Sequence, residues 1–349
     1  MLAALVLCGA SQISCTQGQG ALPRDDIGDA RNDVSNGEGG SVDFTDAAAD
    51  GGGGDSVAIC PRGTIEGDYT IESTADVQAI VGCSRITGSL FVAGPGLGDL
   101  TLPLIKVIRG ALVVSEDAVT GLNLPALYTV AESITVKRSD GLVNIDLAKL
   151  QKTGGLEIAA GRVTELNLPD LFGVDGSLLL ECRELTQLRL PILRRVGQRF
   201  SLVAGKLASV SLPSLLSADV LQVSNLPMLT ELTLPVLEAA ALLWISDNAA
   251  LVSVTAPALP GVGGIFVEHN AALTMVDLSA VKTVERNILI AGNTQLRNLS
   301  FPALLEIKGA LRITSNPKLP NCIAQAISTK ATITEASYVR GNDDLAICP

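Results

Sequence analysis

Aromatic residues are scarce in this chain. Phe, Trp and Tyr make up 3% of its 349 residues, and there is a single Trp. The hydrophobic fraction is nevertheless 47%, and it consists mainly of Leu, Val, Ile and Ala. Aromatic rings fill irregular gaps in ordinary cores, so an interior of aliphatic side chains favours one repeated layer over an irregular core.

Charged residues are also few, at 17%, and the basic ones form no stripe along the chain. The sequence therefore predicts that nucleic acid is not a partner. The net charge of −11 is uneven, because residues 16–59 hold nine Asp and Glu against two Arg. This segment has four consecutive glycines at 51–54 and too little apolar surface to offset its ordering entropy. We expect residues 16–59 to be a disordered, Gly/Asp-rich acidic tether.

Residues 1–15 are apolar but too few to span a bilayer. The run Leu2 to Leu7 resembles the apolar part of a secretory signal. Ser14 and Cys15 resemble the end of a bacterial lipobox, in which the Cys carries the lipid. The leader thus predicts export and a lipid anchor at Cys15, on the bacterial outer membrane or cell surface. Secretion without an anchor, or a periplasmic location, is the alternative.

The other cysteines fall at the two ends of the remaining chain. Cys60 and Cys83 bracket its start, Cys322 and Cys348 bracket its end, and Cys182 stands alone. Two local pairs fit an oxidising compartment and predict two disulfides. Metal binding by these pairs is the alternative, but no CxxC spacing or cluster of His accompanies them. We expect no metal site and no cofactor.

From Cys60 onward the sequence repeats with a period near 22 residues. One motif is apolar-x-apolar-Pro, and Ala148 and Ser279 occupy the proline position in two of the repeats. The motif prolines are Pro103, Pro125, Pro169, Pro191, Pro213, Pro235, Pro257 and Pro302. A proline just past the end of a strand is tolerated, because no ladder hydrogen bond is needed there.

A second motif, apolar-x-apolar, runs in step with the first. Such short period-two patterns predict strands of about three to five residues. The pairs are Tyr69/Ile71, Leu90/Val92, Leu112/Val114, Ile134/Val136, Leu156/Ile158, Leu178/Leu180, Phe200/Leu202, Leu221/Val223, Leu243/Ile245, Ile265/Val267, Ile288/Ile290 and Leu311/Ile313. Each repeat therefore predicts two short strands, followed by an apolar corner such as Leu127 to Val130. Equivalent strands one repeat apart must be parallel, so each coil adds one rung to each sheet.

Late repeats carry an Asn three residues before a Leu, at Asn248, Asn270, Asn293 and Asn316. Stacked on one another, these side chains would form a continuous amide ladder with a structural role. The open ends of a solenoid need caps. The sequence predicts short helices over residues 73–82 and 320–328 for this purpose.

Residues 60–92 resemble the receptor L domain. The resemblance rests on the Cys60 and Cys83 pair, on Ile86-Thr87-Gly88-Ser89-Leu90-Phe91-Val92, and on the later Asn-x-x-Leu and Leu-x-Leu-Pro motifs. It extends over residues 60–349 and is of the type found in bacterial surface lipoproteins. It implies a right-handed parallel β-helix with helical caps, here of about 11–12 coils. It supplies no catalytic residues.

The middle residue of each strand points outward, so the two sheets can be compared. On the strand before each proline the outward residues are all polar, which predicts a solvated face. On the other strand, Trp244, Phe266 and Leu289 fall on successive coils and predict an exposed apolar ladder. They are candidate ligand-binding residues, for a protein or a glycan. The alternative is that another segment covers this sheet, or that these side chains turn inward.

His269 and Cys182 are the two other side chains that could take part in catalysis. His269 has no matched acid or nucleophile in the sequence, so we expect a turn residue. We expect Cys182 to be a semi-buried thiol at a turn rather than a nucleophile.

The function expected is a binding or structural module at the cell surface, without catalysis. The alternative is a polysaccharide-active β-helix enzyme. Such an enzyme needs paired carboxylates on its solvent face. The outward acids Asp146, Glu157 and Asp277 lie on different faces or several coils apart, so they form no such pair.

Overall fold

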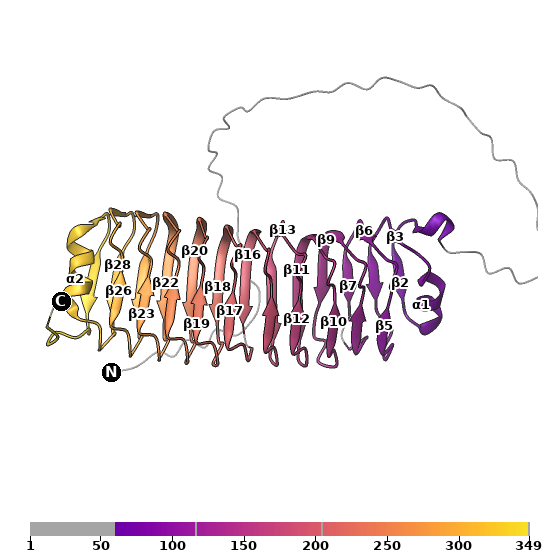
Figure 1. Ribbon diagram of the computed structural model, residues 1–349, viewed down its shortest axis with the longest axis horizontal. Coiled ribbons are helices and arrows are strands. Elements are labelled where there is room, and N and C mark those ends of the chain that lie inside the picture. Colours follow the sequence, from indigo (N-terminus) through magenta and orange to yellow (C-terminus); the bar gives the residue numbers. More distant parts are fainter. Residues whose placement is uncertain (1–59, 116, 204, 348–349) are drawn as a thin grey trace, which may run out of the picture. The chain divides into compact units, whose positions relative to one another are not determined.

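The computed structural model describes residues 60–115, 117–203 and 205–347. These residues belong to one compact unit, a mainly parallel β-solenoid of about 12 turns. Figure 1 shows the coils stacked side by side, with helix α1 (Thr74–Ile80) at one end and α2 (Asn321–Lys330) at the other. The predicted fold class is confirmed, as are helices near both expected positions.

The main face of the solenoid is built by the apolar-x-apolar motif. Every strand pairing on it is parallel, and each strand pairs with its equivalents in the coils before and after. Its strands are β2 (Tyr69–Ile71), β4 (Leu90–Val92), β7 (Leu112–Val114), β9 (Thr129–Val136), β11 (Lys152–Ala160), β14 (Leu178–Cys182), β16 (Arg195–Val203), β18 (Ser217–Ser224), β20 (Ala239–Ser246), β22 (Gly261–Glu268), β25 (Ile288–Ala291), β28 (Leu311–Thr314) and β30 (Ser337–Arg340).

The second face is built by the strands that precede the prolines. It is divided into three shorter parallel sheets. Their exposed residues are mainly polar as expected, but Met275 on β23 is an apolar side chain that is 37% exposed. Its strands are β5 (Asp99–Thr101), β8 (Gly121–Asn123), β10 (Asn144–Asp146), β12 (Glu165–Asn167), β15 (Gln187–Arg189), β17 (Ser209–Ser211), β19 (Glu231–Thr233), β21 (Ser253–Thr255), β23 (Met275–Asp277) and β26 (Asn298–Ser300).

The expectation of two strands and a corner per coil is wrong, because the corner is a third strand. Its β-branched residues are extended and pair with their equivalents, as Val107 does with Thr129. In six coils this strand runs into the main-face strand, which then has eight or nine residues instead of three to five. Where it is separate, it forms β1 (Thr64–Ile65), β3 (Arg85–Ile86), β6 (Val107–Ile108), β13 (Gly173–Val174), β24 (Thr283–Val284), β27 (Glu306–Ile307) and β29 (Thr332–Ile333).

Equivalent residues of successive coils pair with one another even where the repeat is longer than 22 residues. Leu221 pairs with Leu243, 22 residues on, whereas Ile265 pairs with Ile288 and Leu311 with Ser337. The last coil is longer because α2 is inserted in it. Since a slip of one residue would turn every apolar side chain outward, burial of the paired positions fixes the register.

The core consists of the inward members of the strand pairs, stacked coil on coil. Leu221, Leu243 and Ile265 are fully buried, as are their partners two residues later. Among the described residues, Phe200 and Phe301 are the only aromatic side chains in this core. The scarcity of rings in the sequence is thus matched by an interior of aligned aliphatic layers.

The predicted amide ladder is present and longer than expected. The side-chain oxygen of Asn270 accepts from the backbone and side-chain nitrogens of Asn248, both at 3.1 Å, and the pattern repeats through Asn293 and Asn316. Asn342, which the sequence analysis missed, accepts from Asn316 and ends it. All five side chains are buried. Each Asn also donates to a carbonyl of the preceding coil, so one side chain bonds two coils together.

Local rules explain the two capping helices. Ser73 caps α1, because its Oγ accepts from the Asp76 backbone N–H at 3.4 Å. The Asp76 carboxylate accepts from the Ser73 backbone N–H at 2.8 Å and completes a capping box. The helix stops at Ile80, two residues before Gly82. Helix α2 follows Pro320, contacts β26, β29 and β30, and buries Ala324 and Ile327. A one-turn 3-10 helix, η1 (Pro61–Gly63), precedes β1.

Candidate functional site

The candidate site is the platform, defined as Trp244, Phe266 and Leu289. They lie on β20, β22 and β25, and the register pairs Trp244 with Phe266 and Phe266 with Leu289. Adjacent rungs of a sheet are about 4.8 Å apart, so the three side chains stand in one row. All three point away from the core, and Trp244 is 37% exposed. The outward direction expected from the sequence is what the structure has, but Trp244 alone of the three is exposed, because Phe266 and Leu289 are half-buried.

Small residues beside the platform keep it flat. A Cβ atom added at Gly264 would lie 3.2 Å from Cε2 of Phe266 and 3.4 Å from Cδ1 of Leu242. The Phe266 ring therefore lies close over the bare backbone at Gly264. On the other side of the row, Ser246 is buried and Ala291 is half-buried. The larger side chains beside the rings on these rungs are Leu242, two residues before Trp244, and Glu268, two residues after Phe266.

Polar side chains border the platform at its N-terminal end. Gln222 is the outward neighbour of Trp244 on β18. Its Oε1 accepts from Nη1 of Arg199 at 3.0 Å, and its Nε2 donates to Oγ of Ser224 at 3.3 Å. This network fixes the orientation of the amide and of the guanidinium above the sheet.

A cation stacked on a ring borders the C-terminal end. Arg312 on β28 follows Leu289 in the row, and Tyr338 on β30 follows Arg312. The Arg312 guanidinium carbon lies 5.3 Å from the centroid of the Tyr338 ring, within range of a cation–π contact. The row thus continues from apolar rings into a charged and aromatic pair.

Glu268 and His269 lie at the edge of the same rungs. Burial raises the pKa of the Glu268 carboxyl above its usual value, an effect that His269 partly offsets. His269 is in the turn after β22, with a φ of 55°, and its Nδ1 lies 3.9 Å from Oδ1 of Asp247. Both side chains of this pair are largely exposed. His269 is thus a turn residue.

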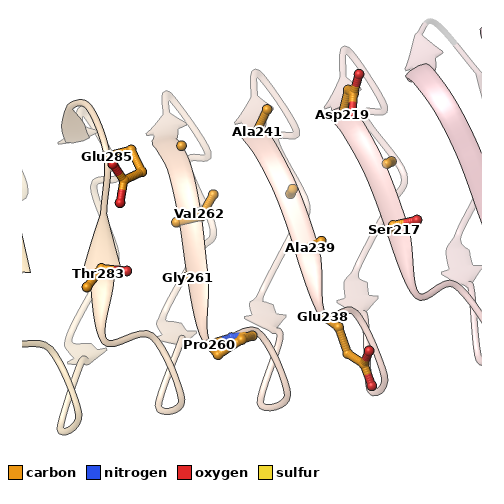
Figure 2. A pocket seen from close by; sticks show the side chains of 13 residues that line it. Ser217, Asp219, Glu238, Ala239, Ala241, Pro260, Gly261, Val262, Thr283 and Glu285 are labelled. Carbon is orange, nitrogen blue, oxygen red and sulfur yellow. The ribbon is translucent and has the colours of Figure 1, made fainter. Parts of the chain in front are cut away.

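A groove that the sequence analysis missed runs beside the platform, at the bend between the third strand and the main-face strand. Figure 2 shows it crossing β18, β20, β22 and β24. Its volume is about 440 Å³. The groove is there because small residues occupy consecutive coils, and their side chains leave the space open. They are Ala239 to Ala241 on β20 and Gly261 and Gly263 on β22. A run of small residues was the available sign, but it carries no chemistry of its own.

The acids of this groove, Asp219, Glu238 and Glu285, do not form a hydrolytic pair. Asp219 and Glu285 occupy equivalent positions three rungs apart, about 14 Å at the usual strand spacing. Glycosidase carboxyls lie at most about 9.5 Å apart. Glu238 precedes β20 and lies three residues before Ala241, the equivalent of Asp219 in the next coil, toward the other end of the groove. Glu285 is ion-paired with Lys308 at 2.7 Å.

The expectation for Cys182 is wrong in its location. Cys182 is the last residue of β14, not a turn residue, and it is 1% exposed. Its Sγ lies 3.7 Å from the Ile158 carbonyl oxygen, the contact that a ladder Asn makes with the coil before it. Burial raises its pKa to about 11, so the thiolate is scarce at neutral pH. Cys182 lies three residues before Leu185, the same spacing as in the Asn-x-x-Leu motif. This spacing could have predicted from the sequence that Cys182 occupies the position of a ladder Asn.

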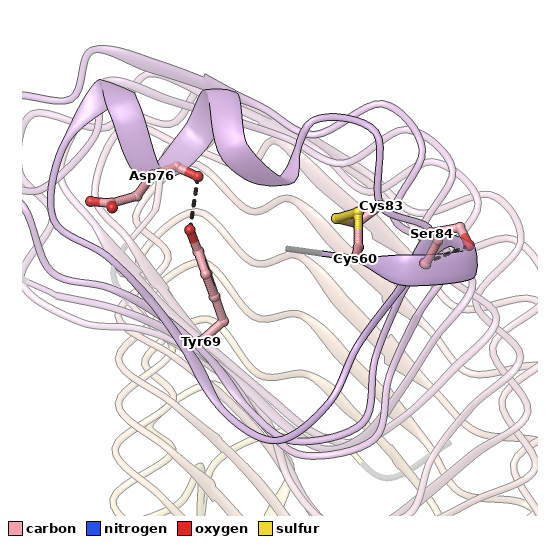
Figure 3. Close-up of a disulfide and its surroundings, with 6 residues drawn as sticks. Cys60, Tyr69, Asp76, Cys83 and Ser84 are labelled. Carbon is pink, nitrogen blue, oxygen red and sulfur yellow. Dashed lines mark hydrogen bonds between the residues drawn. A yellow bond between two sulfur atoms is a disulfide. The ribbon is translucent and has the colours of Figure 1, made fainter. Parts of the chain in front are cut away.

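The disulfide at the N-terminal end is present. Cys60 and Cys83 are bonded, with their Cα atoms 5.7 Å apart, and the bond closes the coil that carries α1. Figure 3 shows the bond in the first coil, where the Tyr69 hydroxyl donates to the Asp76 carbonyl oxygen of α1 at 3.2 Å. At the other end Cys322 is disulfide-bonded. Cys348 and the proposed lipidation site Cys15 lie outside the described residues, as do the leader and the tether.

The described residues contain neither a metal-binding cluster nor a membrane-spanning helix. No group of three or more His, Cys, Asp and Glu in the described ranges is arranged to hold a metal ion. Neither α1 nor α2, the α-helices of that part of the chain, is long and apolar enough to cross a membrane.

Comparison with known proteins gives two partial matches. No family model matches the chain. A stretch of 119 residues, 34% of the chain, is 27% identical to the cell surface GPI-anchored protein ECM33 of Candida albicans and covers 29% of it. A stretch of 80 residues, 23% of the chain, is 25% identical to a cell surface GPI-anchored protein of Arthroderma benhamiae and covers 21% of it. The chain thus matches less than a third of each relative, and both relatives are named as anchored surface proteins.

Proposed function

We propose that this chain is an exported module, held at the cell surface, that binds an envelope partner through the platform and has no catalytic activity. The observation that carries the proposal is the row of Trp244, Phe266 and Leu289 on three successive rungs. Soluble surfaces seldom keep large apolar side chains in one contiguous outward row without a use for them. Aromatic anchors are also enriched among residues that dominate binding energy.

The partial relatives support the location. Both are named as cell surface proteins with a lipid-containing anchor, and neither is named as an enzyme. The spacing of the carboxyl groups in the groove and on the outward strands supports a role without catalysis. We therefore place the polysaccharide-active enzyme second, and expect no release of reducing sugar ends from any polysaccharide that the protein binds.

The test of the platform is a double substitution, Trp244→Ser with Phe266→Ser. The purified full chain is mixed with isolated cell envelopes, and the bound fraction is measured after sedimentation. We expect the double variant to lose most of its binding, because the apolar contact area is gone. The control is Thr255→Ala with Ser300→Ala, two outward residues of the second face. Equal binding by the platform variant and the wild type would overturn the proposal.

For the anchor we propose a lipid on Cys15, as in bacterial lipoproteins of the outer membrane or surface. The intact mass of the mature protein, extracted from membranes, tests it directly. A mass that includes two or three acyl chains on an N-terminal Cys15 is the expected result. Substitution Cys15→Ser should release the protein from the membrane fraction. An unacylated terminus would leave a secreted or periplasmic binding module.

A further inference from the structure

We propose that the platform binds a linear acidic polysaccharide, with sugar rings stacked on Trp244 and Phe266 and anionic groups paired with Arg199 and Arg312. This inference rests on the proposed function and narrows its partner to one chemical class. Its observations are the flat aromatic row, the arginines at both ends of the row, and the local charge.

The shape of the platform favours a sugar chain over a protein. Protein hot spots insert into well-packed pockets. The groove beside the platform contains none of Trp244, Phe266 and Leu289 in its lining. The platform instead presents two aromatic side chains on neighbouring rungs, with Gly264 beside Phe266. The apolar C–H face of a pyranose ring packs on such a surface, and a chain of sugars can follow the row from rung to rung.

The charge of the platform face favours an acidic chain. The main-face strands from β16 to β30 carry three outward arginines along the row, Arg199, Arg312 and Arg340, and a fourth, Arg195, at the start of β16. The acids on the same strands are two, Asp219 and Glu268. This face is therefore locally positive on a chain whose net charge is −11. Among the described residues, no carboxylate forms an ion pair with any of the three guanidinium groups along the row.

Two of these arginines are positioned by contacts that leave donors free. Arg312 is stacked against Tyr338, and Arg199 gives one N–H to Gln222. A guanidinium has five N–H donors in a fork that matches a carboxylate or a sulfate. Their rungs are five steps apart, about 24 Å at the usual spacing, with the rings between them. A ligand that bridges both arginines must therefore be an extended chain of several sugar units.

The experiment is calorimetric titration of the full chain with three probes. Polygalacturonate is a linear polymer with a carboxylate on each sugar, its methyl ester has the same backbone without charge, and dextran sulfate carries sulfate groups. We expect binding to polygalacturonate and at least about tenfold weaker binding to the ester, the effect of losing charge-assisted hydrogen bonds. Dextran sulfate binding that depends on Trp244 would mean that sulfate serves as the anion; no such binding would mean carboxylate.

Three variants complete the test, with folding checked by circular dichroism. Arg312→Gln and Trp244→Ser should each weaken polygalacturonate binding about tenfold. Arg297→Gln, an exposed arginine beside the second face, should leave it unchanged. Equal binding of the ester, or an equal loss in Arg297→Gln, would overturn the acidic-glycan inference. If no probe binds while the platform double variant still fails to bind envelopes, the proposed function stands and this inference is wrong.

Discussion

At the scale of single residues, the buried amides carry more structural weight than their number suggests. Asn293 donates to the Val267 carbonyl at 2.9 Å and accepts from the backbone and side chain of Asn270 at 3.0 and 3.2 Å. A buried donor or acceptor left without a partner costs about 1–3 kcal/mol. The ladder therefore depends on every member, because each amide satisfies groups in two coils.

Replacing Asn293 with Ala tests this dependence. We expect Asn293→Ala to lower the free energy of unfolding by about 2–3 kcal/mol, because Asn270 and Val267 lose their partners in a dry interior. Urea-induced unfolding followed by circular dichroism measures the loss. Asn298→Ala, on the exposed face of β26, is the matched control and should change stability by less than about 0.5 kcal/mol. Equal effects of the two substitutions would contradict a special role for the ladder.

Glu268 predicts a dependence of stability on pH. Burial raises the pKa of this carboxyl in the folded chain above its ordinary value. The folded state therefore holds the proton to higher pH than the unfolded state does, and wild-type stability falls as pH rises through this window. We expect Glu268→Gln to be as stable as wild type at low pH, below both pKa values, and more stable at pH 7.

Thermal unfolding at a series of pH values checks this prediction. The control is Glu165→Gln, an exposed acid at the start of β12. A Glu268→Gln variant that gains nothing at neutral pH would mean that the carboxyl is better solvated than its surroundings indicate.

At the scale of elements, the bends between the third strand and the main-face strand require close approach of successive coils. At Gly197 an added Cβ would lie 2.0 Å from the Asp175 carbonyl oxygen of the coil before. That atom belongs to the backbone, so it cannot swing aside as a side chain would. The bulge in the pairing of β16 with β18 begins next to this glycine, between Val196 and Arg199.

Gly197→Ala should therefore destabilise the solenoid by about 1–3 kcal/mol, the usual cost of forcing an extra group into a packed site. Gly173→Ala is the control, since a Cβ at Gly173 meets nothing within 4 Å. Denaturant unfolding of both variants measures the difference. A neutral Gly197→Ala would mean that adjacent coils can separate at the bend without loss of packing.

The elements also show which features a sequence can predict. Period-two pairs such as Leu243 and Ile245 predicted the main-face strands, because one inward and one outward position are enough to define a rung. The third strand was missed because two residues, as in Val107 and Ile108, are too short to show a period. The N-terminal extension of β20 to eight residues was missed because Ala239 to Ala241 have no apolar alternation.

Some features of the candidate site could be predicted from the sequence and others could not. Alternation predicted that Trp244, Phe266 and Leu289 point outward on neighbouring rungs, and the structure places them there. The contacts between neighbours were beyond the sequence, because they depend on three-dimensional proximity. Examples are the stacking of Arg312 on Tyr338 and the bond from Arg199 to Gln222.

At the scale of the whole molecule, the solenoid is a one-dimensional stack in which each coil contacts its neighbours. Stability is then approximately a sum of coil and interface terms. Leu221 and Leu243 are equivalent, so joining Leu221 directly to Trp244 removes one coil and keeps the register of all others.

Deleting residues 222–243 should therefore give a folded protein that is one coil shorter and slightly less stable. Deleting residues 222–232, half a coil, should abolish cooperative folding, because it places loop residues in the strands that follow. Circular dichroism and the sharpness of thermal unfolding distinguish the two products. Loss of folding in both would show that the stack is not modular at this point.

The disulfide in the first coil has a mechanical consequence. Tension applied to the chain at Cys60 passes through the bond to Cys83 and bypasses β1, β2 and α1, which lie within the closed loop. The first coil therefore cannot be peeled from the stack by a pull from its N-terminal side. Force must instead shear the rungs after Cys83, where many parallel hydrogen bonds share the load, and reducing the bond would let the coils unzip one at a time.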